Sequence, residues 1–154
     1  MRIRQDVEVV LSACRLLVGV SARSVAAVED RVDLIQLRIL TVIASREVVT
    51  LGELAAAVGL HPSRASRGCD RLVETGLIHR DDNPADRRSV HLTLTDAGRA
   101  IVAEVAATRR AALEPALRKL DAEHRLALTS ALERLTTKAG EPADTELWAM
   151  GWAT

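Results

Sequence analysis

Apolar residues near the start of the chain recur in alternating steps of four and three, which is a repeat of seven residues. The positions that follow this repeat are Val7, Leu11, Cys14, Val18, Ser21, Val25 and Val28. A repeat of seven places its members along one side of a helix, where they form a seam for a partner helix. The pattern therefore predicts a helix over about residues 4–29 that packs against another helix.

The C-terminal third of the chain carries a second seam of the same kind. Thr95 is a typical N-cap residue and predicts a long helix through about Arg118, in which Pro115 would cause a kink or a break. A last helix is expected to begin at Asp121. The residues that follow the four-and-three rhythm here are Leu117, Leu120, His124, Ala127, Ala131 and Leu135.

The middle of the chain has shorter patterns, bounded by residues typical of helix ends. A helix is predicted near Leu34–Ser45, and a second one follows Thr50, because Glu53 three residues on completes a capping box. Gly59 is typical of a left-handed helix end.

A third short helix completes this middle segment. It is predicted to open with Pro62 at its first position, where proline fits, and to stop at Gly76. Two short helices joined by a glycine-containing turn of about three residues are the signature of a helix-turn-helix.

The period then changes to that of strands. Residues 77–80 suit a strand, residues 81–88 have the Asp, Asn and Pro content of a turn, and residues 90–94 alternate as a return strand. The expected fold is mainly α with a small β-hairpin wing (α+β), in which terminal dimerisation helices flank a winged helix-turn-helix. The expected segments are an N-terminal dimerisation helix (1–30), the DNA-binding domain (31–95), C-terminal dimerisation helices (96–139) and a tail of uncertain structure (140–154).

The helix that opens at Pro62 divides into two faces. At about 100° per residue, Arg64, Arg67 and Arg71 fall within an arc of about 60°. The opposite side carries the residues expected to face the core: Ala65, Cys69, Leu72 and Val73. A recognition helix needs an apolar back and a front that enters the major groove. An ordinary solvated helix face is the alternative interpretation.

Polar residues beside these arginines extend the candidate site. Ser63 and Ser66 offer hydroxyl donors suited to phosphates or base edges. Arg87 and Arg88 lie at the tip of the hairpin, where an arginine can enter a minor groove, and Asp86 is placed to hold Arg88 by a charge-assisted hydrogen bond. A charged loop that only maintains solubility is the alternative at the tip.

Composition changes this picture only a little. The 154 residues carry 21 basic and 21 acidic side chains, so the formal net charge is zero and gives no argument for a nucleic-acid partner. There is no Phe or Tyr, so the core must be aliphatic. The N-terminus lacks the form of a signal peptide, and the apolar runs look shorter than the ~20 residues of a membrane span. We expect a soluble, cytoplasmic protein with no membrane partner.

The sequence offers no catalytic or cofactor motif. There is no glycine-rich phosphate loop and no nucleophile elbow, so we expect no enzymatic activity and no cofactor. The histidines lack the spacing of metal ligands, although His79 and His91 could meet across the hairpin. No metal site is expected.

The segments Gly76-Leu77-Ile78 and DRRSVHLTLTDAG (residues 86–98) resemble the MarR family of winged helix-turn-helix transcriptional regulators. The shared features are D-x-R at the wing tip, an alternating strand and L-T-x-x-G at the start of the next helix. The resemblance extends over about residues 5–139. It implies a homodimer that binds double-stranded DNA at a pseudo-palindromic operator and regulates transcription as a ligand-responsive repressor.

The resemblance also assigns roles to single residues. Those that match the family's contacts with DNA are Ser63, Arg64, Ser66, Arg67 and Arg71 on the recognition helix and Arg88 in the wing, with Arg87 as a second wing contact. A small-molecule effector is implied, but this chain lacks the aromatic residues that often line the family's cleft. If the effector is an anion, Arg15, Arg23 and Arg38 are candidates to bind it.

Several alternatives stay open at the level of sequence. Cys14 lies near the position of the reactive cysteine in the family's peroxide sensors, but it also lies on the seam, where core packing is the favoured interpretation. Cys69 is expected in the core. Trp148 and Trp152 either anchor the tail or belong to an exposed segment. A winged-helix module for protein–protein contact, without DNA binding, is the alternative function.

Overall fold

The computed structural model describes residues 2–82 and 89–139. Within these residues the helices and strands follow in the order α1 (Arg2–Ala26), α2 (Leu34–Arg46), β1 (Val49–Thr50), α3 (Leu51–Val58), α4 (Pro62–Glu74), β2 (Ile78–Asp82), β3 (Val90–Leu94), α5 (Asp96–Arg118) and α6 (Ala122–Ala139). The mainly helical winged helix-turn-helix is thus confirmed.

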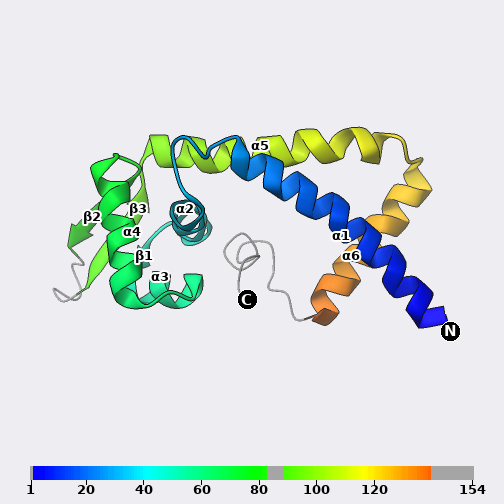
Figure 1. Cartoon of the computed structure of the whole chain (residues 1–154), viewed down its shortest axis with the longest axis horizontal. Helices are drawn as coiled ribbons and strands as arrows, with labels where there is room; N and C mark the ends of the chain where they lie inside the picture. Colours follow the sequence, from blue (N-terminus) through cyan, green and yellow to red (C-terminus); the bar gives the residue numbers. More distant parts are fainter. Residues whose placement is uncertain (1, 83–88, 140–154) are drawn as a thin grey trace.

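The core lies where α2, α3 and α4 meet the small sheet and the first half of α5 (Figure 1). It is aliphatic, as the composition requires. The largest side chains that are fully buried there are Ile39, Leu40, Ile43, Leu54, Leu72 and Leu92. Because α2 sits between the other elements, it is buried on more than one side.

The sheet has one strand more than the sequence pattern indicated. Its order is β1-β3-β2, with all pairs antiparallel. β1 has only two residues, and its Val49 is buried opposite Leu92 of β3. β2 also continues to Asp82, which pairs with Val90. The predicted turn over residues 81–88 therefore begins too early.

The helix ends follow the predicted local chemistry. Thr50 accepts a hydrogen bond from the backbone N–H of Glu53, and the Glu53 carboxylate accepts one in return from the Thr50 N–H. This capping box satisfies amide groups that the first turn leaves without partners. Gly59 ends α3 with φ 62° and ψ 34°, in the left-handed region. Asp33 forms a further capping box with Gln36 that the sequence reading missed.

The long helix α5 connects the winged domain to the other end of the molecule (Figure 1). Thr95 caps it as predicted, and the helix continues through Pro115 to Arg118, so of the predicted kink or break the break does not occur. α1 packs against α5. The hydroxyl of Ser24, which is completely buried, accepts a hydrogen bond of 3.0 Å from Nε of Arg109 and joins the two helices.

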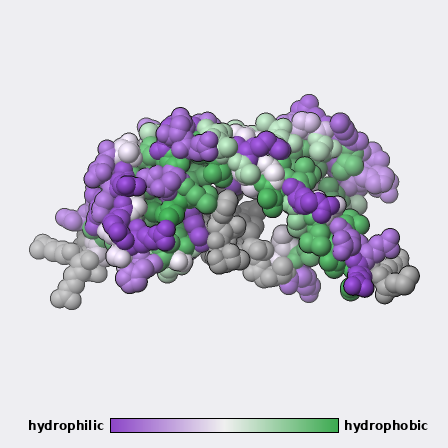
Figure 2. Space-filling view, in the orientation of Figure 1, coloured by the Kyte–Doolittle hydropathy of each residue, from purple (hydrophilic) through white to green (hydrophobic). Residues whose placement is uncertain are grey.

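Much of the apolar surface of α1 and α6 is uncovered in the single chain. Figure 2 shows hydrophobic surface over this part of the molecule, whereas the part around α4 is mainly hydrophilic. Large apolar side chains that are exposed here include Val7, Leu11 and Val18 on the predicted α1 seam and Leu126, Leu132 and Leu135 on α6.

Two expectations about α1 need correction. The helical segment Ile3–Ala26 is long enough to cross a membrane, and an 18-residue window within it is apolar enough by composition, with a mean hydropathy of 1.6. The apolar segment is therefore longer than predicted from the sequence. Cys14 is exposed, so it is not packed in the core of its own chain, and any packing there requires a partner helix.

Candidate nucleic-acid interface

The back of α4 holds this helix firmly on the domain. Ala65, Cys69 and Leu72 are completely buried. A Cβ atom on Gly68 would lie 2.6 Å from Cδ1 of Ile39, so a side chain at this position would displace the side chain of Ile39 in α2. Val73, predicted to face the core, is 39% exposed. It therefore lies at the edge of the buried stripe.

The front of α4 presents its three predicted arginines together. Arg64, Arg67 and Arg71 are exposed. All three line one open groove of about 460 Å³ between α4 and the start of α2. His61 caps this helix, since its ring accepts a hydrogen bond from the N–H of Ser63, and Pro62 is the first helical residue.

The two serines lie differently from each other. The hydroxyl of Ser63 is exposed and lies 2.9 Å from Nδ1 of His61. Ser66 is half-buried, nearer the edge of the helix. The carbonyl of Ser63 also accepts a hydrogen bond of 3.3 Å from Nε of Arg67, which steadies that side chain. Ser63 is thus grouped with the arginines, and Ser66 is set apart from them.

The side of α4 that carries the three arginines also carries acids. Asp70 and Glu74 are exposed there, one turn apart, and both line the same groove. Asp70 is paired with Arg80 of β2, whose Nη1 donates to the carboxylate at 2.7 Å. The sequence reading missed this pair, because ten residues and a change of element separate its members.

The candidate wing contacts Asp86, Arg87 and Arg88 lie outside the described residues. The base of the wing is described, and it explains part of the L-T-x-x-G motif. The Thr95 hydroxyl donates to the carbonyl of Gly76 at 2.8 Å and accepts from the N–H of Gly98. The Thr95 N–H donates to the carbonyl of Leu77. These bonds fasten the start of α5 to the end of the helix-turn-helix.

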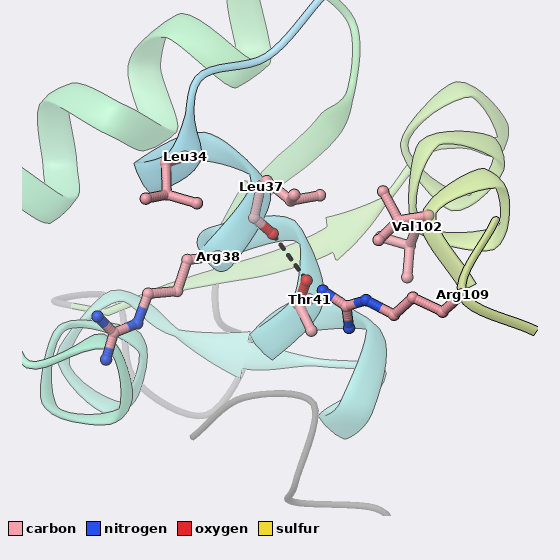
Figure 3. Close-up of a pocket in the computed structure, with 7 residues that line it drawn as sticks. Leu34, Leu37, Arg38, Thr41, Val102 and Arg109 are labelled. Carbon is pink, nitrogen blue, oxygen red and sulfur yellow. Dashed lines mark hydrogen bonds between the residues drawn. The ribbon is translucent and has the colours of Figure 1, made fainter. Parts of the chain in front are cut away.

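A small cleft lies on the other side of α2, facing α5 (Figure 3). Arg38 and Thr41 come from α2, and Arg109 from α5 extends toward Thr41. Leucine and valine side chains form the rest of the lining. The narrow part measures about 20 Å³. A wider space of about 560 Å³ adjoins it and shares Thr41 and Val102.

Two features of this cleft suit an anionic group. Among buried side-chain polar atoms in the described parts of the chain, Nε of Arg38 lacks a hydrogen-bond partner. Burial lowers the pKa of Arg109, because desolvation opposes its charged form. Arg15 and Arg23, the other predicted effector residues, are exposed on α1 and do not line the cleft. Arg109 was not predicted.

The remaining reactive side chains do not form a further site. Burial raises the pKa of the Cys69 thiol to about 11, so the reactive thiolate is scarce near neutral pH. His79 pairs with Thr93 and His91 with Asp81, so the two histidines are not directly opposite across the hairpin. Within residues 2–82 and 89–139, no three His, Cys, Asp or Glu side chains cluster in a way that could hold a metal ion.

Comparison with known proteins gives consistent results. The model of the MarR family matches residues 32–89, which contain the helix-turn-helix and the start of the wing. The HTH-type transcriptional repressor MdtR of Bacillus subtilis is 32% identical over 111 residues, which are 72% of this chain and 69% of MdtR.

Solved structures match over most of the chain. The structure of Rv1404 from Mycobacterium tuberculosis has a TM-score of 0.80 and 34% identity, and the match covers 88% of this chain and 92% of that one. Streptococcus pneumoniae FabT, solved in complex with DNA, has a TM-score of 0.71 over 90% of this chain and 98% of its own, at 19% identity. At this low identity, the match with FabT shows a shared fold only.

Proposed function

Since this chain belongs to the MarR family and is a DNA-binding transcriptional regulator, we propose that it binds a pseudo-palindromic operator as a homodimer and represses transcription there. The observation that carries this proposal is the arginine face of α4, defined as Arg64, Arg67 and Arg71. These side chains are exposed along one side of a helix whose other side is buried. Guanidinium groups bind guanine edges and phosphates in a forked geometry.

The dimer accounts for the uncovered apolar surface of the terminal helices. Exposed aliphatic side chains along α1 and α6 would be buried between two copies, as the hydrophobic effect favours. A two-fold axis would place the two α4 helices in successive major grooves, about 34–36 Å apart. This arrangement gives the apolar length of α1 a partner helix and requires no membrane.

Arg88, with Arg87 as a second contact, is proposed to enter the flanking minor groove, and Asp86 to support it. Replacing Arg88 with alanine should weaken operator binding by about 5- to 30-fold, which corresponds to one lost charge-assisted contact. Thermal unfolding should be unchanged. Equal operator affinity of the variant and the parent protein would show that the wing assignment is wrong.

An effector is proposed to bind between α2 and α5. The desolvated Arg109, which extends toward Thr41, and the unpartnered Nε of Arg38, which extends away from Arg109 (Figure 3), each favour an anionic group at their own side of the cleft. Aliphatic side chains favour an apolar body beside it. The narrow end has to widen to admit such a molecule, which would couple binding to a movement of α2 against α5. A ligand shifts DNA binding only if it prefers one of the two arrangements.

The function is tested with DNA selected from a random pool of duplexes by the full-length protein. We expect enrichment of a sequence with two inverted half-sites and affinity that falls steeply with salt, because counterions are released on binding. Selection without an inverted repeat would contradict the operator proposal. Titration of small carboxylates into the complex tests the effector, and Arg38→Ala should abolish any release of DNA.

A further inference from the structure

The ion pair between Asp70 and Arg80 joins α4 to the sheet within the surface proposed to face DNA. Asp70 lies one turn after Arg67 and next to Arg71 on the same exposed side of α4. The side chain of Arg80 is 36% exposed and that of Asp70 is 51% exposed. The pair is therefore at the surface, close to the arginine face, and not part of the core.

An unpaired carboxylate at Asp70 would oppose DNA binding. Like charges repel, and the interaction between two charges a few ångströms apart is strong at a partly desolvated surface. The guanidinium of Arg80, at 2.7 Å, cancels this charge locally. The same contact keeps Arg80 occupied, so that it is not available to bind phosphates of any sequence.

The pair also limits how α4 can rotate on the domain. On the buried side, the absence of a side chain at Gly68 lets α4 lie close to Ile39 of α2. On the outer side, Asp70 is held by Arg80, whose backbone pairs with the fully buried Leu92 of β3. A small rotation of α4 would displace the arginine face relative to the base edges that it reads.

We propose that Asp70 and Arg80 are a positioning pair that sets how well the protein distinguishes its operator from other DNA. This inference rests on the proposed function, in which α4 enters the major groove. The pair makes no sequence-specific contact of its own. It neutralises one acid beside the arginine face and fixes the orientation of that face, so its loss reduces specificity more than stability.

The test is a double-mutant cycle of the parent protein, Asp70→Asn, Arg80→Gln and the double variant. Affinities are measured by fluorescence anisotropy for the best duplex selected from a random pool and for a scrambled duplex of equal composition. Each single change should lower the ratio of the two affinities by about three- to tenfold, and the double variant should lower it no further, because either change removes the whole pair.

The two single variants should differ in their response to salt. In Asp70→Asn the freed Arg80 can reach a phosphate, so the salt dependence for scrambled DNA should steepen by about one released counterion. Arg80→Gln should show no such increase. Thermal midpoints should stay close to that of the parent protein, since exposed ion pairs contribute little to stability. A purely structural role would change the midpoint and leave the affinity ratio unaltered.

Two controls separate the possible failures. Glu114→Gln breaks the exposed Arg118–Glu114 pair of α5, far from α4 (Figure 1), and should leave the affinity ratio unchanged. Arg67→Ala tests the placement of α4: if it binds the selected duplex as tightly as the parent, the proposed function itself fails. If Arg67→Ala weakens binding but the effects of Asp70→Asn and Arg80→Gln on the ratio multiply, the positioning pair is overturned.

Discussion

At Gly98 the first turn of α5 passes close to the chain that leaves α4. A Cβ atom at this position would lie 2.1 Å from the carbonyl oxygen of Leu77, which is much shorter than any real contact. The glycine of the L-T-x-x-G motif is thus required by packing, in addition to its N–H bond to Thr95. The motif therefore identifies a joint of the fold.

Replacing Gly98 with alanine should lower the free energy of unfolding by about 1–3 kcal/mol, because the backbone of Leu77 has to move. Urea denaturation measures this change. The matched control is Gly52→Ala in α3, where an added Cβ meets nothing within 4 Å and helix propensity favours alanine. If both variants are equally stable, the close approach at Gly98 does not exist.

The buried cysteine of α4 should resist a thiol reagent in the folded protein. Cys69 is completely buried and has a pKa of about 11, so it should stay unmodified in the folded protein and react only after unfolding. Cys14 is exposed in the single chain. The number of thiols modified per chain, measured before and after addition of denaturant, checks this. Rapid modification of two thiols per native chain would contradict the burial of Cys69.

Among the elements, those with strong local signals could be predicted and those made by tertiary pairing could not. The α3 capping box and Gly59 are local, and both were predicted from the sequence. β1 has two residues and no periodicity, since only its pairing with Leu92 makes it a strand. The acidic residues that extend β2 have turn-like chemistry, but pairing with β3 overrides it.

The same limit applies to the candidate site. The row of arginines on α4 follows from helical periodicity, whereas the Asp70–Arg80 pair and the place of Arg109 depend on how separate elements pack. Arg38 was a candidate only because it is basic, and its orphaned Nε is visible only in the folded chain.

The α3 capping box should make stability depend on acid pH. Hydrogen bonds from the backbone and side chain of Thr50 lower the pKa of Glu53 below its usual value. Its contribution is therefore present above the unfolded pKa and is lost as pH falls through the lower folded pKa. The thermal midpoint of the parent protein should exceed that of Glu53→Gln at pH 7, and the difference should shrink below about pH 4. A difference that does not vary with pH would contradict this assignment.

For the whole molecule, the seam on α1 predicts which apolar residues would hold the proposed dimer together. Val7 lies on the seam and is 50% exposed, and Val9 lies off it and is 67% exposed. Val7→Glu should weaken the dimer strongly, because a charge would be buried without a partner, whereas Val9→Glu should not. Sedimentation equilibrium distinguishes the two. If Val9→Glu gives monomers and Val7→Glu gives dimers, the seam is wrongly placed.

The proposed dimer would also connect single residues, helices and the whole molecule. Its two-fold axis would turn one short arginine face into two, and the joint at Gly98 would transmit the spacing of the dimer helices to α4 through α5. An effector between α2 and α5 would act at the same junction. In this proposal, DNA binding, dimerisation and regulation would all depend on the connection along α5.

The most direct measurement is the stoichiometry and salt dependence of binding to the selected duplex, for the parent protein and for Arg67→Ala. If a dimer binds DNA through the arginine face, we expect two chains on each duplex, affinity that falls steeply with salt, and weaker binding with a shallower salt dependence for the variant. One chain per duplex, or equal affinity and salt dependence for the two proteins, would contradict this expectation.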